Sequence, residues 1–97
     1  ILDSQKRELQ SPNEQILELG SHEIIILILL IQNHGTVYER SKLLKNLEID
    51  FLESSDKRLN TILSRLRQKL LNFNVELRIQ TWRNEGYSFI GPNIEIK

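Results

Sequence analysis

The residues best suited to chemistry in this chain are seven cations between positions 57 and 83, and the chemistry they suit is phosphate binding. This segment contains one acid, Glu76, whereas residues 1–56 contain ten acidic and five basic residues. The formal net charge of zero therefore conceals a strong asymmetry, and a phosphate backbone responds to a local face rather than to the total charge. From charge alone, a solvated basic helix explains the segment equally well. The seven cations are Lys57, Arg58, Arg65, Arg67, Lys69, Arg78 and Arg83.

Groups for catalysis or metal binding are scarce. The chain has no cysteine and only two histidines, His22 and His34, which we interpret as a residue in the first turn of a helix and part of a helix stop. Glu14 and Glu18 are typical of an exposed turn and strand, and no Gly-rich phosphate loop is present. The sequence therefore predicts no enzyme, no metal site, no cofactor and no small-molecule substrate.

Residues 55–71 are predicted to form a helix with two distinct faces, capped by Ser54 and Ser55 with Asp56 in its first turn. At about 100° per residue, one stripe is apolar: Leu59, Ile62, Leu63, Leu66 and Leu70. The opposite face carries Lys57, Asn60, Thr61, Ser64 and Gln68, with Arg58 and Arg65 on one flank and Arg67 on the other. No carboxylate follows Asp56 on this surface. Short polar side chains flanked by cations are what a DNA major groove accommodates, although a solvated polar face also explains the polarity.

The elements around this helix are predicted from hydrophobic period and turn residues. Two strands, 7–10 and 15–19, flank a turn, and a helix over 21–33 follows because that apolar run is too long for an average strand. Its all-round apolarity predicts burial on more than one side. A short helix is expected at about 40–47, with its apolar face made by Leu43, Leu44 and Leu47.

A hairpin is expected at the C-terminal end. Val75, Leu77 and Ile79 alternate with polar residues, which predicts a half-buried strand, and a turn at 83–86 leads to a partner strand at 87–90. Trp82 lies near the hairpin tip. Packing against the third helix and contact with solvent or a partner are equally consistent with its position.

The order of strands, three helices and a hairpin resembles the OmpR/PhoB-type winged helix-turn-helix domain, and particular runs carry the resemblance. These runs are Leu19–Glu23, Gly35–Arg40, Leu63–Leu70, Ile79–Thr81 and Gly86–Tyr87. The resemblance implies an α+β fold of one domain, residues 1–97, with a recognition helix at about 55–71 in the major groove and a wing at about 75–90 on the minor groove or backbone. It implies sequence-specific binding of double-stranded DNA by a bacterial transcriptional regulator.

The resemblance also suggests which residues contact DNA. Arg65 and Arg67 match an arginine pair of the family's recognition helix, Arg83 and Tyr87 match a wing arginine and tyrosine, and Lys57 keeps the charge of an arginine. Together with the polar face, the predicted DNA-binding residues are Lys57, Arg58, Asn60, Thr61, Ser64, Arg65, Arg67, Gln68, Arg83 and Tyr87.

Three departures from the family pattern stand out. Asn60 and Thr61 replace an acid and an aliphatic residue, which predicts a different target sequence. Glu48 replaces a tryptophan at the end of the second helix. Asn84 replaces a wing glycine, which is tolerable where a positive φ is needed.

The parent protein is expected to be longer, since the chain starts at Ile1 and has no methionine. In the resembled family such domains are the C-terminal part of two-component response regulators or the cytoplasmic part of membrane-anchored activators of the ToxR and CadC kind. The run Ile24–Ile31 is too short for a membrane span, and we expect a cytoplasmic domain. In the resembled family the loop between the second and third helices can touch RNA polymerase, so the resemblance implies this contact for loop 48–53, whose acidic residues argue against direct DNA contact. The low net charge suggests a homodimer or tandem pairing on DNA.

A winged helix used only for protein interaction is the alternative. The neutral pI and the acidic first half favour it. It requires a contiguous apolar surface on the third helix, and the helical wheel of residues 55–71 predicts none.

Overall fold

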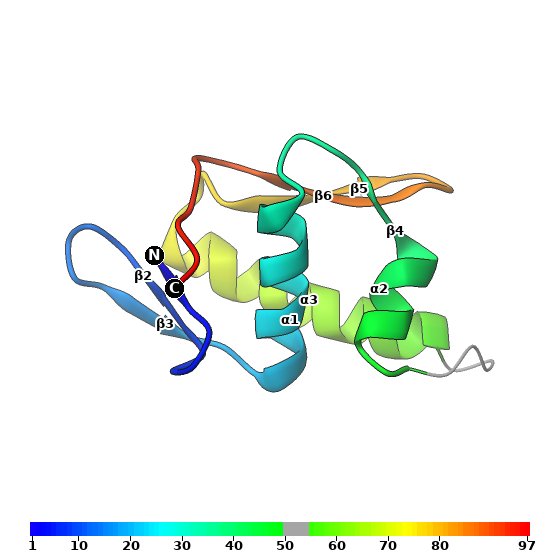
Figure 1. Ribbon diagram of the computed structural model, residues 1–97, viewed down its shortest axis with the longest axis horizontal. Coiled ribbons are helices and arrows are strands. Elements are labelled where there is room, and N and C mark those ends of the chain that lie inside the picture. Colours follow the sequence, from blue (N-terminus) through cyan, green and yellow to red (C-terminus); the bar gives the residue numbers. More distant parts are fainter. Residues whose placement is uncertain (50–54) are drawn as a thin grey trace.

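The computed structural model describes residues 1–49 and 55–97, and the side chains from residue 57 onward in the third helix (Figure 1). Two small sheets pack with three helices around one core. The elements in order are β1 Leu2–Asp3, β2 Glu8–Gln10, β3 Ile16–Glu18, α1 Ser21–Gln32, β4 Tyr38–Glu39, α2 Arg40–Asn46, α3 Ser55–Phe73, β5 Arg78–Trp82 and β6 Gly86–Ile90. The predicted α+β winged-helix architecture is thereby confirmed.

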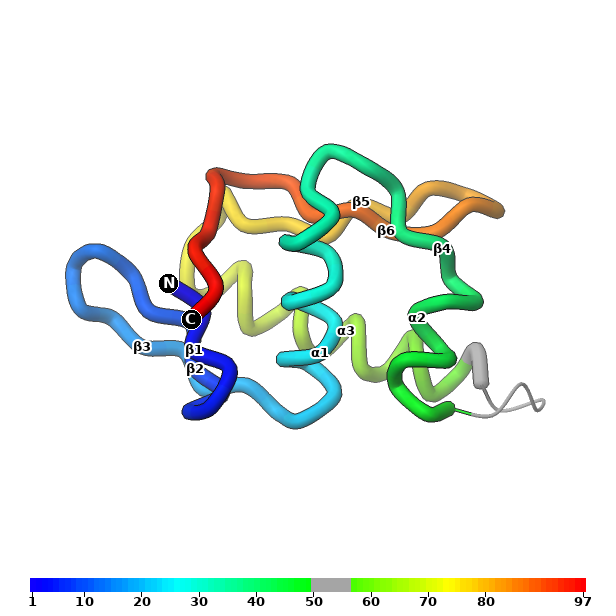
Figure 2. The backbone as a smooth tube through the Cα atoms, viewed as in Figure 1, coloured from blue at the N-terminus to red at the C-terminus, as the bar shows by residue number. Residues whose placement is uncertain are grey.

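The N-terminal sheet has the strand order β1-β2-β3 and contains the predicted hairpin. Leu9 pairs with Leu17 across β2 and β3, and Leu9 is buried in the core. The two-residue strand β1 was not predicted, because so short a segment has no readable period. Its Leu2 N–H donates to the carbonyl oxygen of Glu95 at 2.7 Å, so the C-terminal tail returns to the first strand and the two termini lie close together (Figure 2).

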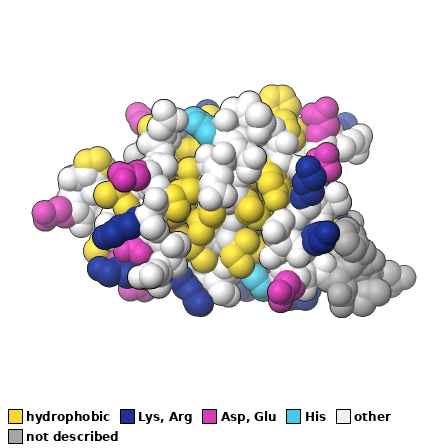
Figure 3. All heavy atoms as spheres, viewed as in Figure 1, with side chains coloured by type: hydrophobic (Ala, Val, Ile, Leu, Met, Phe, Trp, Pro, Cys, Tyr) yellow, Lys and Arg dark blue, Asp and Glu magenta, His cyan; other side chains and the backbone are white. Residues whose placement is uncertain are grey.

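Helix α1 begins and ends almost as predicted. Gly20 is the N-cap, and its N–H donates to Oε1 of Glu23 at 2.7 Å, which satisfies one backbone donor at the helix start. The helix is covered on more than one side, as predicted, but not all around. Ile25, Ile28 and Leu29 are only partly buried, and Figure 3 shows hydrophobic side chains along the middle of the face on which α1 lies. The other apolar residues of the helix face α2, α3 and β6.

Helix α2 ends in a Schellman motif, the common C-terminal arrangement in which the chain reverses through a left-handed residue. The N–H of Ile49 donates to the carbonyl of Leu44 at 3.0 Å, and the N–H of Glu48 donates to that of Lys45 at 3.1 Å. Glu48 supplies the left-handed residue with φ of 58°. Ile49 is then returned to the core, where it is 3% exposed.

The second sheet has the order β4-β6-β5 and forms the wing. Ile79 pairs with Phe89 and Thr81 with Tyr87, so these four side chains share the face toward the core. The short strand β4 before α2 was not predicted, and it pairs Glu39 with Gly86.

The predicted strand start at Val75 was wrong. The carbonyl and side-chain oxygens of Asn74 accept N–H groups of Leu77 and Glu76 in a turn, which leaves Val75 69% exposed.

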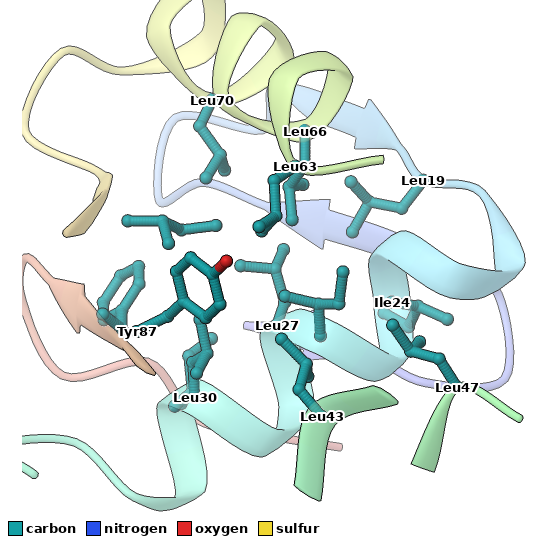
Figure 4. Close-up of a cluster of buried hydrophobic side chains, with 14 of the residues drawn as sticks. Leu19, Ile24, Leu27, Leu30, Leu43, Leu47, Leu63, Leu66, Leu70 and Tyr87 are labelled. Carbon is teal, nitrogen blue, oxygen red and sulfur yellow. The ribbon is translucent and has the colours of Figure 1, made fainter. Parts of the chain in front are cut away.

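The core lies between α1, α3 and the wing, with the N-terminal sheet at one end. Figure 4 shows leucines of α1 and α3 meeting Tyr87 of β6 in its centre. All the apolar stripe of α3 except Ile62 is buried, namely Leu59, Leu63, Leu66 and Leu70. No helix of the described residues combines the length and the apolarity needed to cross a bilayer.

Candidate nucleic-acid interface

Helix α3 presents its polar face to solvent for most of its 19 residues. The apolar stripe binds it to the core, and this packing fixes which side chains point outward. Eight of the ten predicted DNA-binding residues are exposed: Lys57, Arg58, Asn60, Thr61, Ser64, Arg65 and Gln68 on α3, and Arg83 in the wing. Between residues 57 and 73 this surface contains no acid.

Two side chains of the outer face bond within their own helix. The hydroxyl of Thr61 donates to the carbonyl oxygen of Lys57 at 2.9 Å, and the amide of Gln68 donates to Oδ1 of Asn72 at 3.4 Å. Both bonds join residues four apart, so they hold the side chains against the helix. A surface of short, ordered polar groups results, with cations on its flanks.

Arg67 takes a different position from the other predicted contacts. It is half-buried, its Nε donates to the carbonyl oxygen of Ile79 at 3.2 Å, and its Nη2 donates to Oγ1 of Thr81 at 2.5 Å. The guanidinium therefore faces strand β5 of the wing. Its contact with DNA stays a prediction, whereas its contact with the wing is observed.

Tyr87 lies in the core rather than on the outer surface. Its side chain is 6% exposed, and its ring packs among the labelled leucines of Figure 4. Sequence alone could not reveal this, because alternation along β6 does not say which face is covered. A phosphate contact by Tyr87 stays a prediction that concerns its hydroxyl group only.

The wing tip is the second part of the candidate interface. Arg83 is exposed in the turn between β5 and β6, and the next residue, Asn84, has φ of 64°. Asparagine tolerates this left-handed conformation, so the substitution of the expected glycine is explained.

Trp82 does not pack on α3. It lies on the opposite face of the wing from Thr81, is 43% exposed, and donates from Nε1 to Oγ of Ser88 at 2.8 Å. Of the two positions that the sequence left open for Trp82, packing on the third helix is therefore the wrong one.

Two residues beside the interface were missed. His22 is half-buried and lines a hollow of about 360 Å³ with Lys57, Arg58, Thr61 and Ile62 of α3. Arg40 lines a smaller hollow of about 160 Å³ with Thr81, Asn84 and other residues of the wing tip. No local pattern signals either contact, because each joins elements far apart in the chain.

Some predictions concern residues or side chains that the structure does not describe. These are the capping of α3 by the side chains of Ser54 and Ser55, the position of the Asp56 side chain, and the loop at 50–53. Among the described residues there is no group of three or more His, Cys, Asp or Glu side chains that could hold a metal ion.

The chain matches the family model described as "Transcriptional regulatory protein, C terminal" over residues 13–89. This match includes all three helices and almost the whole wing. The chain belongs to this family. Its winged helix is of the OmpR/PhoB type, as the sequence motifs indicated.

Similar proteins include several bacterial regulators. The chain is 35% identical over 89 residues to the transcriptional regulatory protein RstA of Escherichia coli, covering 91% of this chain and 37% of that protein. It is 32% identical over 88 residues to the virulence transcriptional regulatory protein PhoP of Salmonella typhimurium, covering 91% and 39%. The chain thus spans somewhat more than a third of the length of these relatives.

Similar folds are found among solved structures. The DNA-binding domain of Klebsiella pneumoniae RstA, in complex with the RstA box, has 33% identity and a TM-score of 0.72, covering 92% of this chain and 88% of that one. The DNA-binding domain of Bacillus subtilis CssR has 27% identity and a TM-score of 0.74, covering 93% and 98%. The DNA-binding domain of E. coli CadC, at 23% identity and a TM-score of 0.73 with 92% and 83% covered, is alike in fold.

Proposed function

We propose that this domain binds double-stranded DNA sequence-specifically and regulates transcription. The observation that carries the proposal is the exposed polar face of α3, free of acids from Lys57 to Phe73, beside a wing whose tip presents Arg83. The similarity to RstA, whose domain was solved with its DNA box, supports the same use here.

In this function α3 enters the major groove. Asn60, Ser64 and Gln68 carry short donors and acceptors that reach base edges. Lys57 and Arg58 bind phosphates and determine the register of the helix on the duplex, whereas the guanidinium of Arg65 makes a bidentate contact with a base edge. Arg83 reaches the neighbouring minor groove or its backbone, where a cation is attracted to the negative potential.

The surface of α3 favours DNA over a protein partner. Among the described residues of this helix, the one large hydrophobic side chain that is exposed is Leu71, near its C-terminal end and 53% exposed. A protein-interaction module needs a contiguous apolar surface there. The partly exposed residues of α1 lie on another face, and they leave the polar face of α3 available to a duplex.

The net charge of zero suggests that one domain alone binds DNA weakly. We propose that two domains bind repeated half-sites as a homodimer or tandem pair, since linked binding raises occupancy without new base contacts.

The domain acts in the cytoplasm, where the DNA lies, and the parent is either a response regulator or a membrane-anchored activator. The acidic loop 48–53, mostly outside the described residues, contacts RNA polymerase.

Selection from a randomised duplex library tests the proposal. The domain should enrich one motif, and Asn60→Ala together with Ser64→Ala should change or blur that motif while circular dichroism stays the same. Gln10→Ala at the end of β2 and Gln15→Ala just before β3 are the matched control and should leave the motif intact. Enrichment of no motif by the folded domain would refute sequence-specific binding.

A further inference from the structure

We infer that Arg67 is a positioning residue, which holds the wing on α3 so that the wing and α3 meet DNA as one unit. The inference rests on the proposed function and replaces the expected role of Arg67 as a contact to DNA. It starts from the two hydrogen bonds that the guanidinium donates to β5, one to a backbone carbonyl and one to a side-chain hydroxyl.

The two bonds lie where the burial of strand β5 itself stops. Ile79 is the last buried residue of β5, and Gln80, Thr81 and Trp82 are all exposed. The side chains of β5 are therefore buried only as far as Ile79, while Tyr87, the partner of Thr81 on β6, is held in the core. The bond from Arg67 to Thr81 continues the attachment two residues closer to the tip.

The position of Thr81 links this attachment to the wing's contact residue. Thr81 pairs with Tyr87 of β6 and is followed by Trp82 and then Arg83. Fixing Thr81 against α3 therefore limits where Arg83 can lie relative to the outer face of the helix. Pre-organisation of this kind lowers the ordering cost of binding without adding a contact to DNA.

The geometry requires arginine rather than any cation. Nε and Nη2 are held apart in a rigid planar fork, and they reach two acceptors on alternate residues of one strand. Lysine keeps the charge but offers a single flexible ammonium group. A direct phosphate contact by charge would tolerate lysine, whereas the link to β5 would not.

The experiment uses the difference between arginine and lysine at position 67 in a double-mutant cycle. Arg67→Lys and Thr81→Val are each combined with Arg83→Ala, and binding to the selected duplex is titrated by anisotropy. In the wild-type background Arg83→Ala should weaken binding by roughly tenfold. In the Arg67→Lys and Thr81→Val backgrounds it should cost less than about twofold, because the wing is no longer held in place. Arg78→Lys, on the same strand, is the control and should leave the tenfold effect unchanged.

A second readout does not depend on DNA. Trp82 is the sole tryptophan and lies in the wing, so acrylamide quenching of its fluorescence reports how freely the wing moves. Arg67→Lys should increase quenching while far-ultraviolet circular dichroism is unchanged, and Arg78→Lys should not.

The outcomes separate the two proposals. An undiminished effect of Arg83→Ala in the Arg67→Lys background would overturn the inference, and so would unchanged quenching. If no duplex is bound at all, the proposed function fails, and the quenching result alone then decides whether Arg67 holds the wing.

Discussion

The Nζ of Lys69 lies 2.6 Å from Oε1 of Glu23, so an ion pair joins the C-terminal half of α3 to the first turn of α1. Glu23 is buried, and the same oxygen accepts the N–H of Gly20. One carboxylate thereby caps α1 and positions α3. Neither residue of this ion pair is a proposed base contact. The pair instead stabilises the packing of α3 on α1, which holds the proposed base contacts in place.

Lys69→Ala should lower the free energy of unfolding by about 1–2 kcal/mol, because a buried carboxylate loses its charged partner while the Lys69 side chain is 41% exposed. Chemical denaturation measures the loss. Gln68→Ala, on the exposed side of the same helix, should cost less than about 0.5 kcal/mol. Equal effects of the two substitutions would show that the ion pair contributes nothing to stability.

Gly86→Ala should destabilise the wing severely. A Cβ at Gly86 would lie 2.0 Å from the carbonyl oxygen of Tyr38, so β4 and β6 could not stay paired. We expect a loss of more than about 3 kcal/mol in thermal unfolding, or failure to fold. Gly35→Ala is the matched control, since its Cβ meets nothing within 4 Å and only its φ of 89° is costly, at about 1–2 kcal/mol. A Gly86→Ala domain as stable as the control would contradict this pairing.

Glu48→Gly should stabilise the domain by about 0.5–1 kcal/mol. A left-handed residue other than glycine is strained by about 1–2 kcal/mol, and the greater chain entropy of glycine offsets only part of the relief. Asn84→Gly should change stability by a few tenths of a kcal/mol, because asparagine already tolerates its φ of 64°. Denaturant midpoints of the two variants compare them directly, and destabilisation by Glu48→Gly would refute the described helix end.

Periodicity predicted α3 well because its long run of residues keeps one consistent pattern, whereas α1 was predicted from the length of its apolar run. The stripe from Leu59 to Leu70 defined the buried face of α3, and its polar complement defined the candidate interface. The short strands β1 and β4 offered no such run. Val75 continued an alternating pattern, but the turn made by Asn74 removed it from the strand.

The roles of Arg67 and Tyr87 depend on contacts between elements distant in sequence. Arg67 follows the helical pattern of a flanking cation, and only the position of β5 reveals that its guanidinium has acceptors there. The side chain of Tyr87 is buried because the sheet of β4, β6 and β5 covers the core and Tyr87 points from β6 into that core. The family motifs marked both residues as DNA contacts. The three-dimensional structure instead shows that Arg67 bonds to strand β5 and that Tyr87 is buried in the core.

Arg83→Ala should reduce affinity and flatten the dependence of binding on salt by roughly one charge, because one released counterion corresponds to one phosphate contact. The logarithm of the binding constant is measured against the logarithm of salt concentration on the selected duplex. Arg78→Ala, at the other end of β5, should leave the slope within error of the wild type. A slope indifferent to Arg83 would mean that the wing tip does not touch the backbone.

The ratio of affinities for the selected duplex and for a randomised duplex tests sequence-specific binding by α3 most directly. Arg65→Ala should lower this ratio roughly five- to 150-fold, which corresponds to about 1–3 kcal/mol, because its guanidinium loses the proposed bidentate contact with a base. Arg7→Ala removes an exposed arginine from the turn between β1 and β2 and should leave the ratio unchanged. Circular dichroism confirms that both variants fold. A ratio near one for the wild-type domain, or equal ratios for the two variants, would contradict recognition of DNA through α3.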